Sequence, residues 1–330
     1  MNAMMQINKA EPAQLLLLRV RQIRFESIGI NSYEFVDPDG AALPAWDAGS
    51  HLDVHLPGGV IRQYSLCSDP ADHSRYVIAV LKDENGRGGS RLLHETLHVQ
   101  DIIKVSQPRN NFAIHPQAKR HLLIGGGIGI TPLKAMAHKL AAEGKIFELH
   151  YCAKTPAYAS FREELTAANI ATRFHYDNGN PAHGLDIVSL LMDYTEGTHV
   201  YYCGPGGFMV ACSAATRHWP LGTVHSEHFK APDTPAPDLP NDAADDFTVK
   251  IASTGTEFNI PADRSIVDVL HDAGIMIETS CVSGLCGSCK TKYLAGAVDH
   301  RDFILSDDER KTHLTVCVSR ATTHNLILDI

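Results

Sequence analysis

The sequence contains no long apolar run and no excess of basic residues. No stretch approaches the roughly 18 consecutive apolar residues that a membrane helix needs, and residues 15–18 are too few for the core of a signal peptide. Asp and Glu number 38 against 29 Lys and Arg, a net charge of −9, whereas phosphate binding needs a basic surface. We therefore expect a cytoplasmic protein that binds neither membrane nor nucleic acid.

The negative charge is concentrated in the last third of the chain. Residues 1–230 carry 21 Lys and Arg against 22 Asp and Glu, a net charge of −1, whereas residues 231–330 carry 8 against 16, a net charge of −8. Residues 231–244 contain four prolines and little to bury, so they predict a semi-stiff, exposed linker. The uneven charge and the linker both indicate separate domains, in keeping with the length of the chain.

Short β-rich runs between turn residues extend from Leu15 to about Phe112 and predict an antiparallel barrel or sandwich. Further on, apolar runs alternate with helical patterns, as in a parallel α/β sheet. The last part opens with two strand-like runs, continues with a helix over 265–273 and then becomes rich in cysteine, which predicts a small α+β domain. We thus expect a multi-domain protein divided at 1–113, 114–230, a linker at 231–244, and 245–330.

The cysteines carry the strongest functional signal. Cys281, Cys286 and Cys289 follow the spacing C-x4-C-x2-C, and Cys317 lies 28 positions further on in a strand-like run. This is the spacing of plant-type ligands to a [2Fe-2S] cluster. Structural zinc sites usually have two C-x2-C pairs and this loop has one, so zinc is the lesser alternative. Without a secretory segment disulfides are disfavoured, and the other cysteines are expected to pack as small apolar side chains. They are Cys67, Cys152, Cys203 and Cys212.

Two strand-to-helix turns have the composition of nucleotide-binding loops. The first, GGGIGITP at residues 125–132, follows an apolar run, and its glycines would let the backbone approach a pyrophosphate. Because it is not G-x-G-x-x-G, this loop alone fits a dinucleotide site and a merely tight turn about equally well. The second, CGPGG at residues 203–207, would meet the first at the carboxyl ends of parallel strands, where ligands bind.

Two segments of the predicted barrel also have a chemistry suited to phosphate. The strand RQYS at residues 62–65 carries an arginine, and the loop NGRGGS at residues 85–90 could wrap an anion. Taken singly, the first fits any amphipathic strand and the second fits a flexible hairpin.

The order of these motifs along the chain resembles that of the phthalate dioxygenase reductase family. The motifs are RQYS, GRGGS, GGGIGITP, CGP and the C-terminal cysteines. Members of this family, vanillate demethylase reductase among them, are the reductase components of Rieske oxygenases. The resemblance covers about residues 15–330. It implies an FMN-binding barrel, an NAD-binding α/β domain that uses NADH, a plant-type [2Fe-2S] ferredoxin domain, and a terminal Rieske oxygenase as partner.

The resemblance also implies which residues contact each cofactor. No side-chain acid, base or nucleophile is required, so no catalytic residue is expected. The expected flavin contacts are Arg62, Gln63, Tyr64, Ser65, Ala79, Val80, Gly88, Gly89, Ser90 and Phe229. The expected nucleotide contacts are Gly125, Gly126, Gly127, Ile128, Gly129, Thr131, Pro132, Cys203, Gly204 and Pro205. The expected cluster ligands are Cys281, Cys286, Cys289 and Cys317. Lys154 lies where a 2′-phosphate could bind, but NADH is expected.

One motif points to different chemistry. Residues 94–98 read HETLH and match the zinc metalloprotease pattern H-E-x-x-H. A working zinc site needs a third ligand and an open cleft, whereas this segment follows the GRGGS loop and runs into a strand, so we expect no zinc here. Two other functions stay open: a reductase for a haem-thiolate monooxygenase, and a non-enzymatic iron–sulfur or zinc protein whose glycine loops are structural.

Overall fold

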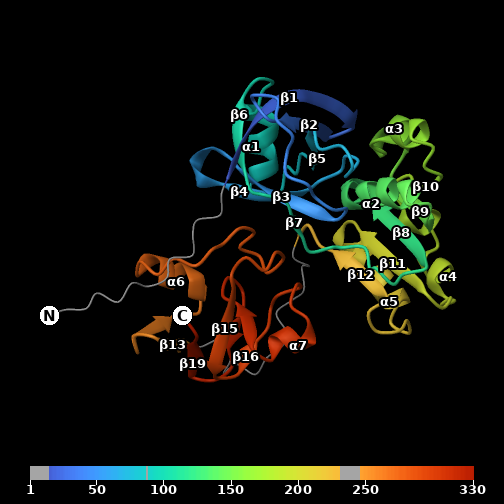
Figure 1. Cartoon of the computed structure of the whole chain (residues 1–330). Coiled ribbons are helices and arrows are strands. Elements are labelled where there is room, and N and C mark those ends of the chain that lie inside the picture. The colour runs from blue at the N-terminus through green and yellow to red at the C-terminus, as the bar shows by residue number, and fades with distance from the viewer. Residues whose placement is uncertain (1–14, 87, 231–245) are drawn as a thin grey trace.

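The computed structural model describes residues 15–86, 88–230 and 246–330, so the predicted linker lies outside the described residues. Figure 1 shows the barrel in blue and teal beside the α/β domain in green and yellow, with the C-terminal domain in orange and red below them. The predicted fold class, an antiparallel barrel followed by a parallel α/β domain and a small α+β domain, is confirmed. None of the described helices is both long and apolar enough to span a bilayer.

The barrel strands pair antiparallel in the order β4-β3-β6-β1-β2-β5, and a bridge between Leu66 and Ile78 joins the two outer strands. Alternating residues such as Leu18 and Val20 of β1 fill the interior, as the period of a strand requires. The elements are β1 (Leu16–Ser27), β2 (Ile30–Val36), β3 (Ser50–His55), β4 (Ile61–Ser65), β5 (Tyr76–Leu81), α1 (Gly89–Thr96), β6 (Ile102–Val105) and β7 (Arg109–Asn110). A 3₁₀ turn, η1 (Pro57–Gly59), connects β3 to β4.

The α/β domain is a parallel sheet in the order β10-β9-β8-β11-β12, with helices on both faces. On β8, Leu123 packs toward α2, while Leu122 and Ile124 pack toward α4 and α5. The strands are β8 (Arg120–Gly126), β9 (Ile146–Ala153), β10 (Thr172–Tyr176), β11 (Thr198–Cys203) and β12 (Val224–Glu227). The helices are η2 (Gly127–Gly129), α2 (Ile130–Ala142), η3 (Pro156–Tyr158), α3 (Arg162–Ala167), η4 (Pro181–His183), α4 (Ile187–Leu191) and α5 (Gly206–Ala215).

The C-terminal domain has a mixed sheet in the order β14-β13-β19-β15-β17, with α6 packed against its apolar face. Ser265 begins α6 through a capping box with Asp268, which satisfies the first backbone N–H groups of the helix. The elements are β13 (Phe247–Ile251), β14 (Glu257–Ile260), α6 (Ile266–Asp272), β15 (Lys290–Ala295), β16 (Val298–Asp299), α7 (Asp307–Arg310), β17 (His313–Thr315), β18 (Arg320–Ala321) and β19 (Asn325–Leu328). The strand predicted to contain Cys317 ends at Thr315, so this cysteine lies in the following turn.

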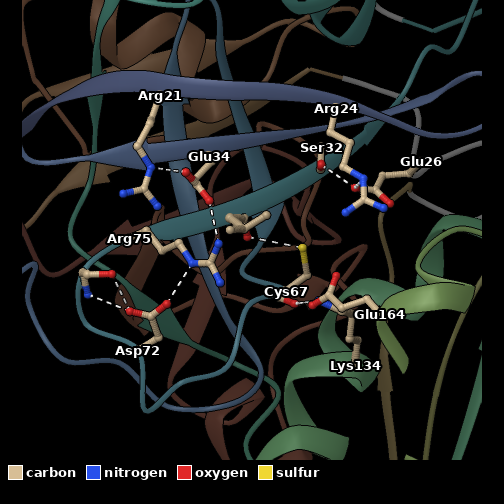
Figure 2. Close-up of polar contacts among 12 residues, drawn as sticks. Arg21, Arg24, Glu26, Ser32, Glu34, Cys67, Asp72, Arg75, Lys134 and Glu164 are labelled. Carbon is tan, nitrogen blue, oxygen red and sulfur yellow. Dashed lines mark hydrogen bonds and ion pairs between the residues drawn. The ribbon is translucent and has the colours of Figure 1, made fainter. Parts of the chain in front are cut away.

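A buried lysine joins the barrel to the α/β domain (Figure 2). Lys134 on α2 is 1% exposed, and its Nζ donates a hydrogen bond of 2.6 Å to the carbonyl oxygen of Cys67, just after β4. The same Nζ lies 2.5 Å from Glu164 Oε1 on α3. A buried charge is tolerated only when it is paired, so these contacts fix α2 against the barrel.

The cysteines outside the C-terminal motif and the H-E-x-x-H segment have structural surroundings. Cys67, Cys203 and Cys212 are fully buried and Cys152 is partly buried, as predicted for small apolar side chains. His94 lies on α1 with its Nε2 2.8 Å from the carbonyl oxygen of Val80, whereas His98 lies beyond the end of the helix with an exposed side chain. The two histidines therefore do not share a helical face as the protease motif requires.

Candidate electron-transfer site

One pocket lies where the three domains meet. It is lined by β4 of the barrel, by residues 226–229 at the end of the α/β domain, and by residues of the cysteine loop and of segment 303–304. Of the residues expected to contact flavin, the pocket unites Arg62, Gln63, Tyr64, Ser65 and Phe229. Cys281, an expected cluster ligand, lines the same pocket. The geometry thus brings five of the ten predicted flavin residues and one of the four predicted cluster ligands to one place.

Next to the pocket, β4 packs closely against the start of α1. A Cβ at Gly89 would lie only 2.4 Å from Arg62 Nε, so no larger residue fits there while Arg62 keeps this position. Gly88 precedes the helix with φ of 79°, a conformation that favours glycine. An arginine beside the amino-terminal N–H groups of a helix is a setting suited to a phosphate. The structure therefore has a cradle of the kind an FMN phosphate needs.

Five of the expected flavin residues do not line this pocket: Ala79, Val80, Gly88, Gly89 and Ser90. Ser90 Oγ accepts a hydrogen bond of 3.1 Å from the backbone N–H of Asp83, which ties the loop to the helix. Ala79 and Val80 are buried in β5 and do not belong to the pocket lining. The GRGGS segment, read from the sequence as a loop, enters α1 at Gly89.

The two glycine loops lie against each other at the carboxyl ends of β8 and β11, as expected. A Cβ at Gly129 would lie 2.2 Å from the carbonyl oxygen of Cys203, and a Cβ at Gly126 would lie 3.0 Å from Pro205. Thr131 Oγ1 donates a hydrogen bond of 3.0 Å to the carbonyl oxygen of Ile128, which closes the turn into α2. The expected nucleotide residues are thus brought together at this edge of the sheet. Most of them are buried, and those with exposed surface there are Gly127, Ile128, Gly204 and Pro205.

The Gly129→Ala substitution is expected to weaken NADH binding, because its methyl group would separate the two loops. We expect the KM for NADH to rise about tenfold, equivalent to roughly 1.4 kcal/mol. The measurement is steady-state ferricyanide reduction with varied NADH. The control is Lys145→Ala, at an exposed position of the same domain. An unchanged KM in Gly129→Ala would contradict the assignment of this loop.

The four cysteines of the C-terminal motif are arranged as two pairs. In the described residues no three His, Cys, Asp or Glu side chains form a group that could hold one metal ion. Instead, Cys281 hydrogen-bonds to Cys286, and Cys289 hydrogen-bonds to Cys317. The bond from Cys281 lowers the pKa of Cys286 to about 5. Two pairs of thiols match the needs of two bridged irons, each of which takes two cysteine ligands.

Backbone N–H groups of the cysteine loop stabilise negative charge on the cysteine sulfur atoms. The N–H of Leu285 points at Cys281 Sγ over 3.3 Å, and the N–H of Ser288 points at Cys286 Sγ over 3.4 Å. Gly284 has φ of 71°, and a Cβ there would lie 2.8 Å from Val318. Such N–H groups stabilise thiolates, and the glycine allows the tight turn. The donor set and the loop therefore fit a [2Fe-2S] cluster.

Sequence reasoning missed a carboxyl group in the pocket. Ser65 Oγ donates a hydrogen bond of 3.0 Å to Glu227 Oε2, across 162 residues of sequence. Burial raises the pKa of Glu227 to about 7, although the Ser65 hydroxyl opposes this shift. Glu227 is one of the residues that line the pocket. Glu227 is thus neutral below about pH 7 and negatively charged above it.

The Glu227→Gln substitution is expected to remove a pH dependence from flavin reduction. Hydride transfer adds negative charge to the ring system, so an ionised Glu227 would oppose it and the wild-type rate should fall as the pH rises through about 7. The glutamine variant should stay flat across this range in stopped-flow measurements. Glu163→Gln, at a side chain that is 94% exposed, is the control. A glutamine variant with the wild-type pH profile would refute this role.

Residues 249–322 match the family described as the 2Fe-2S iron-sulfur cluster binding domain. The reductase subunit of tert-butanol monooxygenase / tert-amyl alcohol desaturase from Aquincola tertiaricarbonis is 52% identical over 327 residues, covering 97% of each chain. A solved structure of phthalate dioxygenase reductase, described as a modular structure for electron transfer from pyridine nucleotides to [2Fe-2S], is 43% identical with a TM-score of 0.72. It covers 96% of this chain and 98% of the other.

The chain belongs to the phthalate dioxygenase reductase family. As a member, it is an oxidoreductase that transfers electrons, and the predicted cofactors FMN, [2Fe-2S] and NADH are confirmed. A second structure, an intact type IV self-sufficient cytochrome P450 monooxygenase, is 36% identical with a TM-score of 0.84. It matches 96% of this chain but only 41% of its own length. The same reductase architecture therefore also occurs joined to a haem enzyme.

Proposed function

We propose that this protein takes a hydride from NADH and delivers single electrons to a terminal Rieske oxygenase. The observation that carries the proposal is the pocket shared by Arg62, Phe229 and Cys281, one from each domain. FMN, when bound, can accept two electrons as hydride and release them singly, which matches NADH to a one-electron cluster. The chain itself supplies position and charge, not an acid or a nucleophile.

The proposed residue roles follow the arrangement of the pocket and loops. Arg62 and the start of α1 hold the flavin phosphate, and the rest of β4 lies along the ring. The glycine loops after β8 and β11 hold NADH so that its nicotinamide can reach the pocket. The four cysteines hold the cluster beside it. The proposed domains are residues 1–113, 114–230 and 245–330, with a linker at 231–244. The proposed location is the cytoplasm, because the eight cysteines form no disulfide and the cytoplasm keeps thiols reduced.

An oxygenase with a Rieske centre suits the direction of electron flow. Plant-type clusters lie near about −400 mV and Rieske centres between about −150 and +300 mV, so the onward step is downhill. Residues 231–330 carry a net charge of −8, which favours a partner with a basic docking surface. Reductase subunits of oxygenase systems among the relatives support an oxygenase as acceptor.

The test is direct reduction of purified acceptors. NADH-reduced protein is mixed without oxygen with a panel of purified Rieske oxygenase components, and reduction of each Rieske centre is followed by its absorbance and electron paramagnetic resonance. We expect rapid reduction of at least one component, slowed by added salt because exposed charges are screened. Failure to reduce any of them would contradict the proposal.

A haem-thiolate monooxygenase is the second candidate acceptor, favoured by the likeness to the self-sufficient cytochrome P450. The same experiment separates the two when purified cytochrome P450 enzymes are included in the panel. Reduction of a P450, seen as its carbon monoxide difference spectrum, without reduction of a Rieske centre would favour the haem acceptor. Cytochrome c accepts electrons from many reductases, so it does not discriminate between them.

A further inference from the structure

A buried aspartate connects the barrel to the cysteine loop. Asp53 lies on β3, is 5% exposed and accepts hydrogen bonds from three segments of the chain. Its Oδ1 receives Gln63 Nε2 at 3.1 Å and Ser280 Oγ at 2.6 Å, and its Oδ2 receives Arg109 Nη2 at 2.6 Å. Gln63 lines the flavin pocket, and Ser280 immediately precedes the cluster ligand Cys281.

The carboxylate is held in its charged form. Burial alone would raise the pKa of Asp53, but hydrogen bonds from Arg109 and Ser280 outweigh burial and hold the pKa below its usual range. Hydrogen bonds to an ionised acceptor are shorter and stronger than neutral ones, in agreement with the two contacts of 2.6 Å. Within the barrel Arg109 and Gln63 already satisfy this charge, so the Ser280 contact adds an attachment between domains.

Neighbouring contacts hold the same loop to the barrel. Asn111 Nδ2 donates a hydrogen bond of 3.0 Å to the carbonyl oxygen of Cys286. Arg109 Nη1 lies 3.9 Å from Glu278 Oε1, an exposed and therefore weak pair. The loop is thus held at two places, beside Cys281 by Asp53 and at Cys286 by Asn111, which lines the flavin pocket.

We propose that Asp53 is a positioning residue whose bond to Ser280 latches the cysteine loop to the flavin pocket and so sets the rate of electron transfer from flavin to cluster. The inference rests on the proposed function. One electron leaves the reduced flavin and one electron enters the oxidised cluster, while Asp53 neither gains nor loses a proton. Tunnelling falls exponentially with distance, and a loosened loop holds its cysteines at a greater average distance.

Ser280→Ala is the main variant, because it removes the latch and leaves the Asp53 pairs with Arg109 and Gln63 in place. Ser280→Thr keeps the hydroxyl and serves as the conservative rescue. Asp53→Asn weakens the latch from the barrel side. Asp272→Asn is the control, because it makes the same charge change on α6, in an exposed ion pair with Arg264.

The experiment is anaerobic stopped-flow reduction by NADH, combined with hydrogen–deuterium exchange of residues 278–286. In Ser280→Ala we expect flavin reduction at the wild-type rate, cluster reduction slowed by on the order of tenfold, and faster exchange of the loop. In Asp53→Asn we expect slower cluster reduction and faster exchange of the loop, together with a change in flavin reduction through Gln63. Ser280→Thr and Asp272→Asn should resemble the wild type in flavin reduction, cluster reduction and exchange of the loop.

The readouts separate failure of the latch from failure of the proposed function. In Ser280→Ala, a parallel fall of both rates would indicate general damage to the fold and overturn the proposal, as would unchanged cluster reduction and unchanged exchange. Failure of the wild-type flavin to reduce the cluster would instead overturn the proposed function.

Discussion

The Cys289→Ser substitution is expected to abolish electron delivery to one-electron acceptors while NADH still reduces the flavin. Cys289 is 3% exposed and pairs with Cys317, whose hydrogen bond lowers the pKa of Cys289 and favours the thiolate that iron needs. Replacing a residue that only supports a metal ligand typically lowers metal affinity or activity by about 10–100-fold. Loss of a ligand itself should therefore lower the rate of cytochrome c reduction by about 100-fold or more.

Two measurements check this result. The long-wavelength absorbance and the electron paramagnetic resonance signal of the reduced protein should disappear in Cys289→Ser, while ferricyanide reduction through the flavin is retained. Cys152→Ser is the matched control, because this cysteine lies on β9 in the α/β domain and should leave the cluster spectra intact. Normal spectra and normal cytochrome c turnover in Cys289→Ser would overturn the ligand assignment.

The Lys134→Met substitution is expected to be the most destabilising change outside the cluster. It removes a charged hydrogen bond to the Cys67 carbonyl oxygen and the partner of Glu164, while keeping an apolar chain of similar length. Glu164 is 39% exposed and can regain water, but the buried carbonyl cannot. We therefore expect a loss of about 2–3 kcal/mol in the free energy of unfolding, below the full cost of breaking a buried ion pair.

Lys139→Met is the matched control on the same helix, because Lys139 forms exposed pairs with Asp47 and Glu143. Exposed pairs contribute about 0–1 kcal/mol, so this variant should unfold near the wild-type midpoint. Urea unfolding followed by fluorescence and by flavin release measures both variants. Equal midpoints for Lys134→Met and Lys139→Met would show that the buried lysine does not join the two domains.

Local patterns explain how much of this protein could be predicted from its sequence. Apolar runs predicted β8, β9 and β11, because strands buried on both faces need continuous apolar residues. The spacing of the cysteines predicted the [2Fe-2S] domain that the family match confirms, since three of them lie on one short loop whose geometry depends on neighbouring residues. The glycine loops were placed together correctly because parallel strands end at the same edge of a sheet.

Contacts between distant segments could not be predicted in this way. Ser65 and Glu227 are 162 positions apart and Asp53 and Ser280 are 227 apart, and nothing local to either residue indicates its partner. Lys134 is the clearest example, because a lysine in a helical pattern is usually exposed, whereas here the barrel covers it. β12 was also missed, since its short run VHSE is only partly buried and weakly apolar.

The central claim is that electrons pass from NADH through the flavin in the shared pocket to a cluster held by the four cysteines. Anaerobic mixing with one equivalent of NADH, followed by absorbance and by freeze-quench electron paramagnetic resonance, tests it most directly. The account predicts that flavin absorbance falls first and that the signal of a reduced [2Fe-2S] cluster follows. A cluster reduced without prior loss of flavin absorbance, or a protein that contains no flavin, would contradict it.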